Sequence, residues 1–298
     1  MKIVNFGSLN LDHVYRVPHA VATGETLAAA SFQILLGGKG LNQSVAIARA
    51  GANVLHGGFI GGDPKAKDLV DCMEASGVDV SKIRTTSEPQ GHALIQVNDE
   101  GNNCIVIYGG SNQCVSKEYI DEVLAEFEDG DYVVLQNETS NVEYAIEQAN
   151  AKGCKVVLNA SPIDERMLAL DYNKVDWLII NEIEGAAIAG VEDIEQIIPV
   201  LSERYSKLNI VLTLGVEGSR CYTGGEVYTQ AAFKANAVDT TAAGDTFLGY
   251  VVAGLVAGTP MQEILRTASA ASSIAVSIMG AAGSIPKYEA VMKYLENL

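Results

Sequence analysis

Short apolar runs alternate with amphipathic stretches through most of the chain, and this alternation predicts strands and helices in turn. The expected strands cover residues 2–6, 54–60, 132–136, 155–158, 177–180 and 210–214. The expected helices cover residues 40–50, 64–76, 141–152 and 193–206. Short apolar strands that alternate with helices are typical of a parallel sheet. We therefore expect an α/β protein in which helices cover a mainly parallel sheet.

Two parts of the chain depart from this alternation. The last third predicts consecutive helices at about 244–257, 260–279 and 286–297. Four β-like segments also lie outside the scheme, at residues 11–17, 31–36, 92–98 and 103–108. The last two flank Asp99-Glu100-Gly101-Asn102, a good hairpin turn. We expect these four strands to form a small separate sheet, made by two excursions of the chain at about 11–36 and 90–110.

The composition fits one large domain with this appendage. The chain has 298 residues, of which 48% are hydrophobic, and its mean hydropathy is +0.15. That is ample for a large buried core, so we expect a single domain over residues 1–298.

The charge of the chain excludes some partners. The formal net charge is −17 at neutral pH. An acidic surface repels nucleic acid and anionic lipid, so we expect neither as a partner. It also disfavours a phosphate-rich ligand at long range, so an ATP site would depend on local dipoles and on Mg2+.

The five cysteines lie far apart in the sequence, and none forms a C-x-x-C pair. A zinc site is therefore not expected, and the odd number is typical of a reducing cytoplasm. Asn5, Asn10 and Asp12 interrupt the first residues too early for a secretory signal. No apolar run approaches the ~18 residues of a membrane span. We expect a cytoplasmic location.

The stretch D-T-T-A-A-G-D at 239–245 carries the clearest chemical signal. Ala242, Ala243 and Gly244 are small and directly precede Asp245 and an apolar helical run. Uncovered N–H groups at a helix start suit an anion, whereas a carboxylate there repels phosphate. The carboxylate makes sense if it takes a proton from a hydroxyl that attacks the phosphate. The pattern predicts phosphoryl transfer to an alcohol. The alternatives are that Asp245 only stabilises the helix start, and that Asp239 only caps the turn.

Two further motifs suit a polyol. Asn10 and Asp12 follow a strand end and lie two residues apart, so their side chains would face one side of an extended segment. The glycines of G-G-K-G at 37–40 would let the backbone approach a ligand closely. The alternatives are that both motifs only make turns, and that Lys39 is a solvated surface lysine.

Asn181 and Glu184 lie where an apolar strand ends and a helix begins. Their spacing fits a capping box, which is the simplest explanation. Their place at the carboxyl end of a strand, where sites of α/β proteins gather, favours a function as well.

Three motifs together resemble the ribokinase-like (phosphofructokinase-B type) sugar kinases: G-S-L-N-L-D at 7–12, G-G-K-G-L-N-Q at 37–43 and D-T-T-A-A-G-D at 239–245. The resemblance extends over essentially the full length, and within the family it is greatest to the ribokinases. It implies a three-layer α/β/α core with a mainly parallel central sheet, and a small β-sheet lid that often makes a dimer contact.

The resemblance also implies roles for individual residues. Sugar contacts are implied for Asn10, Asp12, Gly38, Lys39, Asn42 and Glu138. Nucleotide contacts are implied for Asn181, Thr213, Gly215, Gly218 and Ser269. Asp245 matches the catalytic base, and the N–H groups of Ala242, Ala243, Gly244 and Asp245 match the anion hole. Glu184 matches a residue that organises Mg2+ through water, and a monovalent-cation (K+) site is implied at Asp239, Thr241, Val276, Ala281 and Ser284.

The expected activity is therefore transfer of the γ-phosphoryl group of ATP to the primary hydroxyl of a sugar, with ribose 5-phosphate as the product. Fructose or another sugar, or a nucleoside such as pseudouridine, is the alternative substrate. A nucleoside needs an aromatic platform, for which Phe6, Tyr15 and Tyr108 are the only candidates near the small sheet. An alternative of another class is a sugar-binding regulator without catalysis, which the intact Gly244 and Asp245 disfavour.

Overall fold

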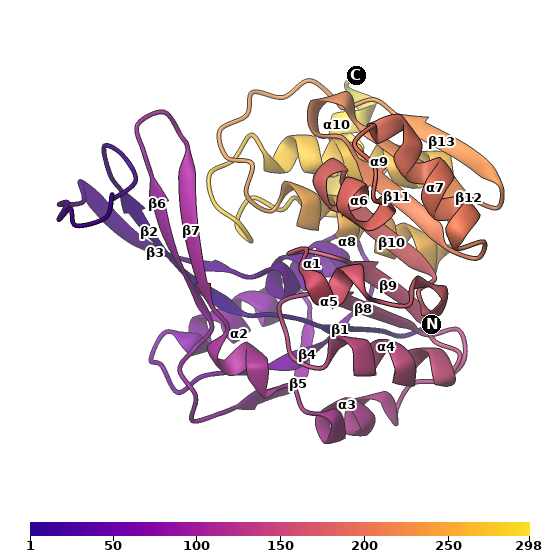
Figure 1. Ribbon diagram of the computed structural model, residues 1–298, viewed down its shortest axis with the longest axis horizontal. Helices are drawn as coiled ribbons and strands as arrows, with labels where there is room; N and C mark the ends of the chain where they lie inside the picture. Colours follow the sequence, from indigo (N-terminus) through magenta and orange to yellow (C-terminus); the bar gives the residue numbers. More distant parts are fainter.

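The computed structural model describes all 298 residues and contains two β-sheets. The larger sheet has nine strands in the order β13-β12-β11-β10-β9-β8-β1-β4-β5 (Figure 1). They are β1 (Ile3–Phe6), β4 (Leu55–Ile60), β5 (Asp79–Thr85), β8 (Tyr132–Gln136), β9 (Lys155–Asn159), β10 (Trp177–Asn181), β11 (Asn209–Thr213), β12 (Ser219–Thr223) and β13 (Glu226–Gln230). Every pairing from β11 to β5 is parallel, whereas β12 pairs antiparallel with both of its neighbours.

Helices cover both faces of this sheet. One face carries α3 (Lys117–Leu124), α4 (Val142–Ala151), α5 (Glu165–Leu168), α6 (Glu182–Ala189) and α7 (Ile197–Arg204). The other carries α1 (Lys39–Arg49), α2 (Ala66–Ala75), α8 (Ala243–Ala257), α9 (Met261–Ala275) and α10 (Tyr288–Glu296). The predicted three-layer α/β/α architecture is confirmed.

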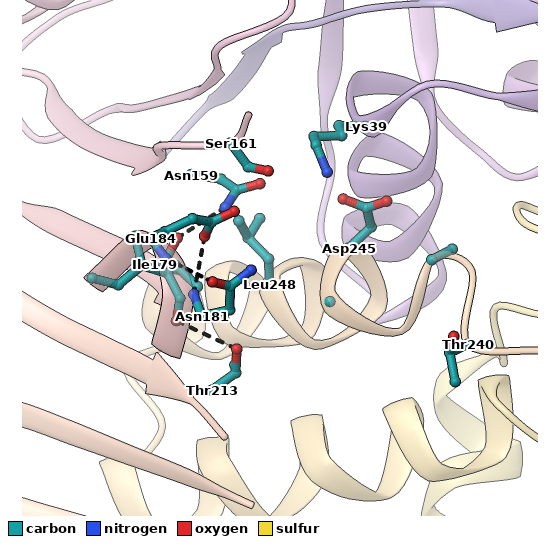
Figure 2. A pocket seen from close by; sticks show the side chains of 13 residues that line it. Lys39, Asn159, Ser161, Ile179, Asn181, Glu184, Thr213, Thr240, Asp245 and Leu248 are labelled. Carbon is teal, nitrogen blue, oxygen red and sulfur yellow. Dashed lines mark hydrogen bonds between the residues drawn. The ribbon is translucent and has the colours of Figure 1, made fainter. Parts of the chain in front are cut away.

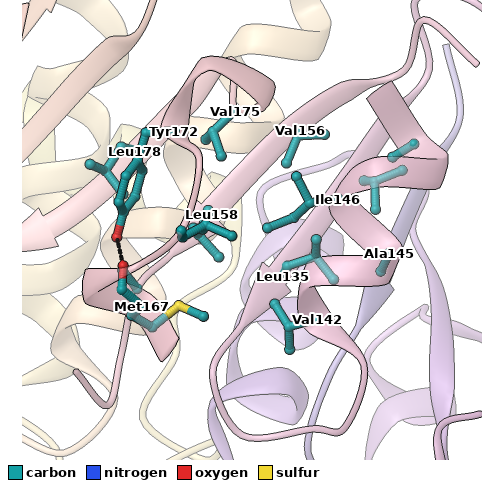
Figure 3. Packing of buried hydrophobic residues seen from close by; sticks show 14 of the residues in the cluster. Leu135, Val142, Ala145, Ile146, Val156, Leu158, Met167, Tyr172, Val175 and Leu178 are labelled. Atoms are coloured by element: carbon teal, nitrogen blue, oxygen red, sulfur yellow. Dashed lines mark hydrogen bonds between the residues drawn. The ribbon is translucent and has the colours of Figure 1, made fainter. Parts of the chain in front are cut away.

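Each helical layer is held to the sheet by its own apolar core. Alternate residues of a strand point to opposite faces, so the strands divide their apolar side chains between the two cores. On the α4 face, Leu135 and Leu158 pack against Ile146 of α4 and Met167 of α5 (Figure 3). On the α8 face, Val134 and the other strand residues that point to this face pack against the helices of the α8 layer.

The small sheet contains the four strands expected outside the main alternation. Its order is β3-β2-β6-β7, and it projects from the main body (Figure 1). The strands are β2 (Asn10–Arg16), β3 (Ser31–Gly37), β6 (His92–Val97) and β7 (Asn103–Tyr108). The central β2–β6 pairing is parallel and the outer pairings are antiparallel.

Some elements differ from the expectation. The search for apolar runs missed β5, β12, β13, α3 and α5. The strands β5 and β13 form the two edges of the sheet, β12 lies next to β13, and all three are partly polar. The turn between β12 and β13 uses Gly224 and Gly225, both with positive φ, which is a recognisable hairpin signal. The expected helix 193–206 is a 3-10 turn followed by α7, and the expected helix 260–279 ends at Ala275. No helix in the structure is both long and apolar enough to cross a membrane.

Close contact between α1 and α8 fixes the start of α8. A Cβ atom at Gly249 in α8 would lie 2.3 Å from the Cβ of Ala46 in α1, far closer than non-bonded carbons approach. The glycine therefore allows the two helices to touch. Because Asp245 lies one turn earlier in α8, this contact also places Asp245 beside α1.

We expect Gly249→Ala to lower the free energy of unfolding by about 1–3 kcal/mol, because overpacking at this crossing exceeds the helix-propensity gain of about 1 kcal/mol. Urea denaturation measures the change. Gly62→Ala is the matched control, because the nearest atom to its added Cβ would be 4.0 Å away. Equal stability of the two variants would contradict the packing argument.

Candidate active site

A cavity lies at the carboxyl ends of the central strands, between β9, β10 and the start of α8 (Figure 2). Sites in open parallel sheets form at this edge. Lys39 and Asp245 line one side, while Asn181, Glu184 and Thr213 line the other. The remaining lining residues are Asn159, Ser161, Ile179, Ile180, Thr240, Ala242, Gly244 and Leu248.

The start of α8 presents free backbone donors to this cavity. Ala242 is the N-cap residue, and its φ of 61° is unusual for a residue with a side chain. The backbone N–H groups of Gly244 and Asp245 donate no hydrogen bond within the chain, whereas that of Ala243 donates to the carbonyl of Thr240 at 3.3 Å. No heavy atom lies within 4 Å of a Cβ placed on Gly244. The turn is therefore open to an anion.

Two amide side chains from α1 hold the carboxylate of Asp245. Asn42 Nδ2 donates to Oδ2 and Gln43 Nε2 donates to Oδ1, each at 2.9 Å. Each carboxylate oxygen has a further lone pair, so Asp245 can still accept a proton. The structure thus brings the 37–43 motif into contact with Asp245.

Glycines bring the G-S-L-N-L-D and G-G-K-G segments into contact. A Cβ on Gly40 would lie 2.4 Å from Cα of Gly7 and 2.3 Å from the backbone nitrogen of Ser8. Gly38 has a φ of 95°, and a Cβ there would meet the carbonyl oxygen of Ser8 at 2.9 Å. A Cβ on Gly37 would overlap Asp12. These positions require glycine because the two segments approach each other closely, and Gly38 also requires it because its φ is positive.

Acidic side chains surround Lys39 at this junction. Glu138 accepts hydrogen bonds from the hydroxyl of Ser8 and, at 3.1 Å, from the backbone N–H of Lys39. Burial raises the pKa of Asp12 to about 7, and the nearby Glu138 and Asp245 add to this rise. Burial also raises the pKa of Glu138.

Lys39 is not a solvated surface lysine, because it lines the cavity and points towards Asp245 (Figure 2). Burial alone lowers the pKa of its ammonium group, but the carboxylates of Asp245, Glu138 and Glu184 raise it overall. Lys39 is therefore a fixed positive charge in a predominantly acidic protein.

Asn10 is buried at the root of the small sheet. Its Oδ1 accepts a hydrogen bond from Asn112 Nδ2 at 2.8 Å, and Asn112 Oδ1 accepts one from the backbone of Leu9 at 2.9 Å. Asn112 thus holds Asn10 beside Asp12. This role of Asn112 was not predicted, because Asn112 stands outside the three motifs.

Asn181 and Glu184 form the capping box and also line the cavity. Glu184 N donates to Asn181 Oδ1 at 2.9 Å, and Asn181 N donates to Glu184 Oε2 at 3.0 Å. The two interpretations of the motif are therefore compatible. Glu184 Oε1 has no hydrogen-bond partner in the chain and remains available at the cavity.

The other residues expected at the nucleotide are spread over a wider area. Thr213 lines the cavity and donates to the carbonyl of Ile180 at 3.3 Å. Gly215 and Gly218 lie in the turn that follows β11, both with positive φ. Ser269 lies in α9 with 6% of its surface exposed, and it does not line this cavity.

The residues expected at a monovalent cation lie in two loops that contact each other. Val276 O accepts hydrogen bonds from the backbone of Val238 and Asp239, at 2.8 and 3.1 Å. Asp239 accepts from Thr241 N at 2.9 Å and from Gly280 N at 3.0 Å. The turn-capping role, which was the alternative interpretation of Asp239, is thus present. Ala281 and Ser284 are buried in the second loop, and the hydroxyl of Ser284 donates to Ala281 O at 2.8 Å.

No candidate aromatic platform faces the sugar-side residues. Phe6 is in the core with 1% of its surface exposed, which corrects its placement near the small sheet. Tyr15 lies an odd number of residues from Asp12 on β2 and therefore points to the opposite face. Strand pairing links Tyr108 through His92 to Leu11, so Tyr108 shares that opposite face.

Nearly the whole chain is similar to known carbohydrate kinases. A model described as pfkB family carbohydrate kinase matches residues 1–288. The ribokinase of Haemophilus influenzae is 36% identical over 301 residues, covering 98% of this chain and 97% of that protein. A crystal structure of ribokinase from Thermotoga maritima aligns with a TM-score of 0.89 at 30% identity, over 100% of both chains. The structure of Arabidopsis thaliana ribokinase complexed with ribose and ATP has a TM-score of 0.85 at 29% identity, over 99% of this chain and 98% of that one.

The raised pKa of Asp12 predicts a pH-dependent stability. The unfolded chain releases this proton near the ordinary aspartate pKa of about 3.9, whereas the folded chain retains it up to about pH 7. The contribution of Asp12 to stability therefore falls as the pH rises between these values. We expect Asp12→Asn to raise the free energy of unfolding by about 1–3 kcal/mol at about pH 8 and to change it little near pH 4.

Urea denaturation at both pH values measures this effect. Asp68→Asn, at an exposed position on α2, is the control that changes one charge elsewhere. If Asp12→Asn changes the free energy of unfolding by the same amount at both pH values, the raised pKa of Asp12 is contradicted.

Proposed function

The chain belongs to the pfkB family of carbohydrate kinases, and we propose on that premise that it transfers the γ-phosphoryl group of ATP to the primary hydroxyl of ribose. The products are ADP and ribose 5-phosphate. The observation that carries this proposal is the Asp245 carboxylate at the start of α8, next to the free N–H groups and Lys39. The relatives compared above are ribokinases that align over nearly the full length of both chains, which favours ribose.

In this mechanism Asp245 accepts the proton of the attacking hydroxyl. Removal of the proton in the transition state makes the oxygen a better nucleophile. Asn42 and Gln43 hold the carboxylate while it does so. The negative charge that develops on the phosphoryl oxygens is stabilised by the N–H groups of Gly244 and Asp245 and by the ammonium group of Lys39.

The sugar is held on the other side of Asp245. Asn10, Asp12 and Glu138 supply acceptors for hydroxyl groups, since a polyol is rich in O–H donors. Asn42 Oδ1 is buried and has no hydrogen-bond partner in the chain. A buried acceptor without a partner is costly, and the amide keeps this orientation because its NH2 group donates to Asp245.

A monosaccharide fits this region better than a nucleoside. The face of the small sheet that carries Asp12 offers neither Tyr15 nor Tyr108 as a platform for a base. The alternative of a non-catalytic regulator is disfavoured, because Gly244 leaves the start of α8 open and Asp245 is held towards the cavity.

The nucleotide would lie across the ends of β10 and β11. Asn181 and Thr213 line this side of the cavity, and the positive-φ turn at Gly215 and Gly218 follows β11. Ser269 is assigned to the adenine side by family resemblance, although its side chain lies outside the cavity.

Mg2+ and K+ are the proposed metal cofactors. Glu184 has one carboxylate oxygen without a partner at the cavity, which suits an ion that retains its own water molecules. When bound, Mg2+ neutralises charge on the phosphates. Asp239, Thr241, Val276, Ala281 and Ser284 offer only oxygen ligands, as a hard monovalent cation requires. The cytoplasmic location expected from the cysteines stays a prediction.

The small sheet would act both as a lid over the sugar and as the contact of a homodimer. Strand β7 is an edge strand and is exposed along its whole length. Its exposed apolar residues are Ile105, Val106, Ile107 and Tyr108. An unpaired, apolar edge on a projecting sheet is a surface that proteins usually cover. A second copy of the chain is the proposed cover.

A coupled assay of ADP formation tests the function. We expect kcat/KM to be highest for ribose in a panel with 2-deoxyribose, fructose and pseudouridine, each assayed with and without K+. Asp245→Asn should lower kcat by about 10²–10⁴-fold, the usual contribution of a general base. Asp68→Asn is the control. Turnover of Asp245→Asn at a near wild-type rate would refute the base assignment.

Light scattering during size-exclusion chromatography tests the dimer. We expect the wild type to elute at about twice the 31.5 kDa chain mass, and Val106→Lys to elute as a monomer. A charge buried at an interface without a partner strongly disfavours association. Val227→Lys, at a similarly exposed position on β13, should leave the mass unchanged. A monomeric wild type would overturn the proposal.

A further inference from the structure

Four buried or partly buried amide side chains form a continuous hydrogen-bonded network behind Asp245. They come from β1, α1, β8 and β9: Asn5, Gln43, Gln136 and Asn159. Gln136 Nε2 donates to Asn5 Oδ1 at 2.8 Å and to Gln43 Oε1 at 2.7 Å. Gln43 Nε2 then donates to Asp245 Oδ1 at 2.9 Å and to Asn159 Oδ1 at 3.2 Å. The base is therefore connected to three strands of the central sheet.

A backbone carbonyl fixes the direction of this network at one end. Asn5 Nδ2 donates to the carbonyl oxygen of Gly40 at 2.9 Å, and a carbonyl oxygen can only accept. Asn5 Oδ1 must therefore face Gln136, which has to present its NH2 group. Because the same NH2 group faces Gln43, the carbonyl of Gln43 points to Gln136 and its NH2 group points to Asp245.

A second carbonyl fixes the direction independently at the other end. Asn159 Nδ2 donates to the carbonyl oxygen of Ile179 at 3.0 Å, so Asn159 Oδ1 faces Gln43. A reversed Gln43 amide would place its oxygen against the oxygens of Asp245 and Asn159, and its NH2 group against that of Gln136. Both anchors therefore give Gln43 a single orientation, in which it donates to Asp245.

The network also extends to a buried histidine. Asn5 Nδ2 donates to Ser44 Oγ at 2.9 Å, and Ser44 Oγ lies 2.8 Å from His56 Nδ1. His56 Nε2 lies 3.2 Å from the carbonyl of Gly7, so Nε2 carries the proton and Nδ1 accepts from Ser44. Burial lowers the pKa of His56 to about 4, which keeps the ring neutral.

This arrangement is unfavourable as mere core packing. Gln136 Oε1 is buried and has no partner, because turning the amide would break its two donations. An unpaired buried acceptor is unfavourable, and an apolar residue at this position would avoid that cost. The orientation that Gln136 imposes on Gln43 is a reason to retain an amide at position 136.

We propose that Gln43 is a positioning residue for phosphoryl transfer, locked by Gln136 and Asn159 so that it always donates to Oδ1 of Asp245. This inference rests on the proposed function, because it takes Asp245 to be the base. Gln43 and Asn42 each hold one oxygen, so the carboxylate cannot turn without losing both hydrogen bonds. Gln43 itself is fully buried and acts only through Asp245.

Gln43→Met tests the proposal, since methionine has a similar length and no donor. We expect kcat to fall about 10–100-fold, as for a lost hydrogen bond to a charged group, with the sugar KM changed less than about threefold. The acidic limb of the kcat/KM profile should move to higher pH, because a carboxylate that loses a donor holds its proton more tightly. The other charged groups around Asp245, which are Asp12, Lys39 and Glu138, are unchanged in this variant.

Gln90→Met is the matched control. Gln90 is also buried, donates to Leu9 O at 2.6 Å and accepts from Gly61 N at 2.9 Å, but does not contact the network. Its replacement should lower stability and leave the acidic limb in place. If the acidic limb shifts equally in both variants, the effect of Gln43→Met is one of general destabilisation, and the proposal is overturned.

Asp245→Asn separates the two hypotheses. If Asp245→Asn keeps near wild-type turnover, the proposed function fails. If Asp245→Asn is inactive while Gln43→Met keeps the wild-type kcat and acidic limb, the positioning role alone is overturned. If Gln43→Met does not fold, as judged by circular dichroism, Gln136→Met replaces it, because it removes the donor to the Gln43 carbonyl and leaves Asn159 as the one remaining anchor. A smaller shift in the same direction is then expected, and an unchanged limb overturns the proposal.

Discussion

The structure depends on how polar side chains at the ends of the central strands are paired beneath α1. On the face towards α1 and α8, β1, β8 and β9 each change from an apolar to a polar residue within one pleat repeat. The pairs are Ile3 and Asn5, Val134 and Gln136, and Val157 and Asn159. Buried amides must be hydrogen-bonded, and these are satisfied by one another, by α1 and, for Asn159, by the carbonyl of Ile179. The apolar core ends where this amide layer begins, and the active site lies directly above it.

Close contacts between glycines and their neighbours give the amide layer its geometry. Gly40 lets α1 begin against Gly7 and Ser8 at the end of β1, and Gly249 lets α8 touch Ala46 of α1. The helix α1 is thereby fixed to the sheet at its start and to α8 along its length. Since Asn42 and Gln43 are in the first turns of α1, both contacts are needed to bring their amides within reach of Asp245.

Much of the fold could be predicted because buried parallel strands are nearly continuous apolar runs. Strands such as β8 and β10 were visible for that reason, whereas the partly exposed edge strands β5 and β13 were not. The helix that ends at Ala275 was predicted too long, because the chain turns there so that Val276 can accept hydrogen bonds from another loop. That interaction joins residues far apart in the sequence, and local pattern does not contain it.

The candidate site was predictable to the extent that its residues lie in short motifs. Asp245, Asn42 and Lys39 meet as the motifs imply, although their roles stay predictions. Asn159 and Ser161 were missed because they stand singly at the end of β9 and just after it, and their importance appears only when other elements pack against them. The repeated change from an apolar to a polar residue at strand ends was a usable signal, which the apolar runs alone did not reveal.

The distribution of donors and acceptors explains how an acidic protein can hold an anion. A net charge of −17 repels phosphate at a distance, so attraction must come from groups in direct contact. The donors are concentrated on one side, at the N–H groups of Gly244 and Asp245 and the ammonium group of Lys39. The acceptors Asp12 and Glu138 lie towards the small sheet, and burial, which raises the pKa of each, limits the negative charge that they add. The side towards the small sheet therefore favours a ligand with hydroxyl donors, and the side with Lys39 favours a ligand with phosphate oxygens. Asp245 lies at the boundary between them, where the proposed proton and phosphoryl transfers would take place.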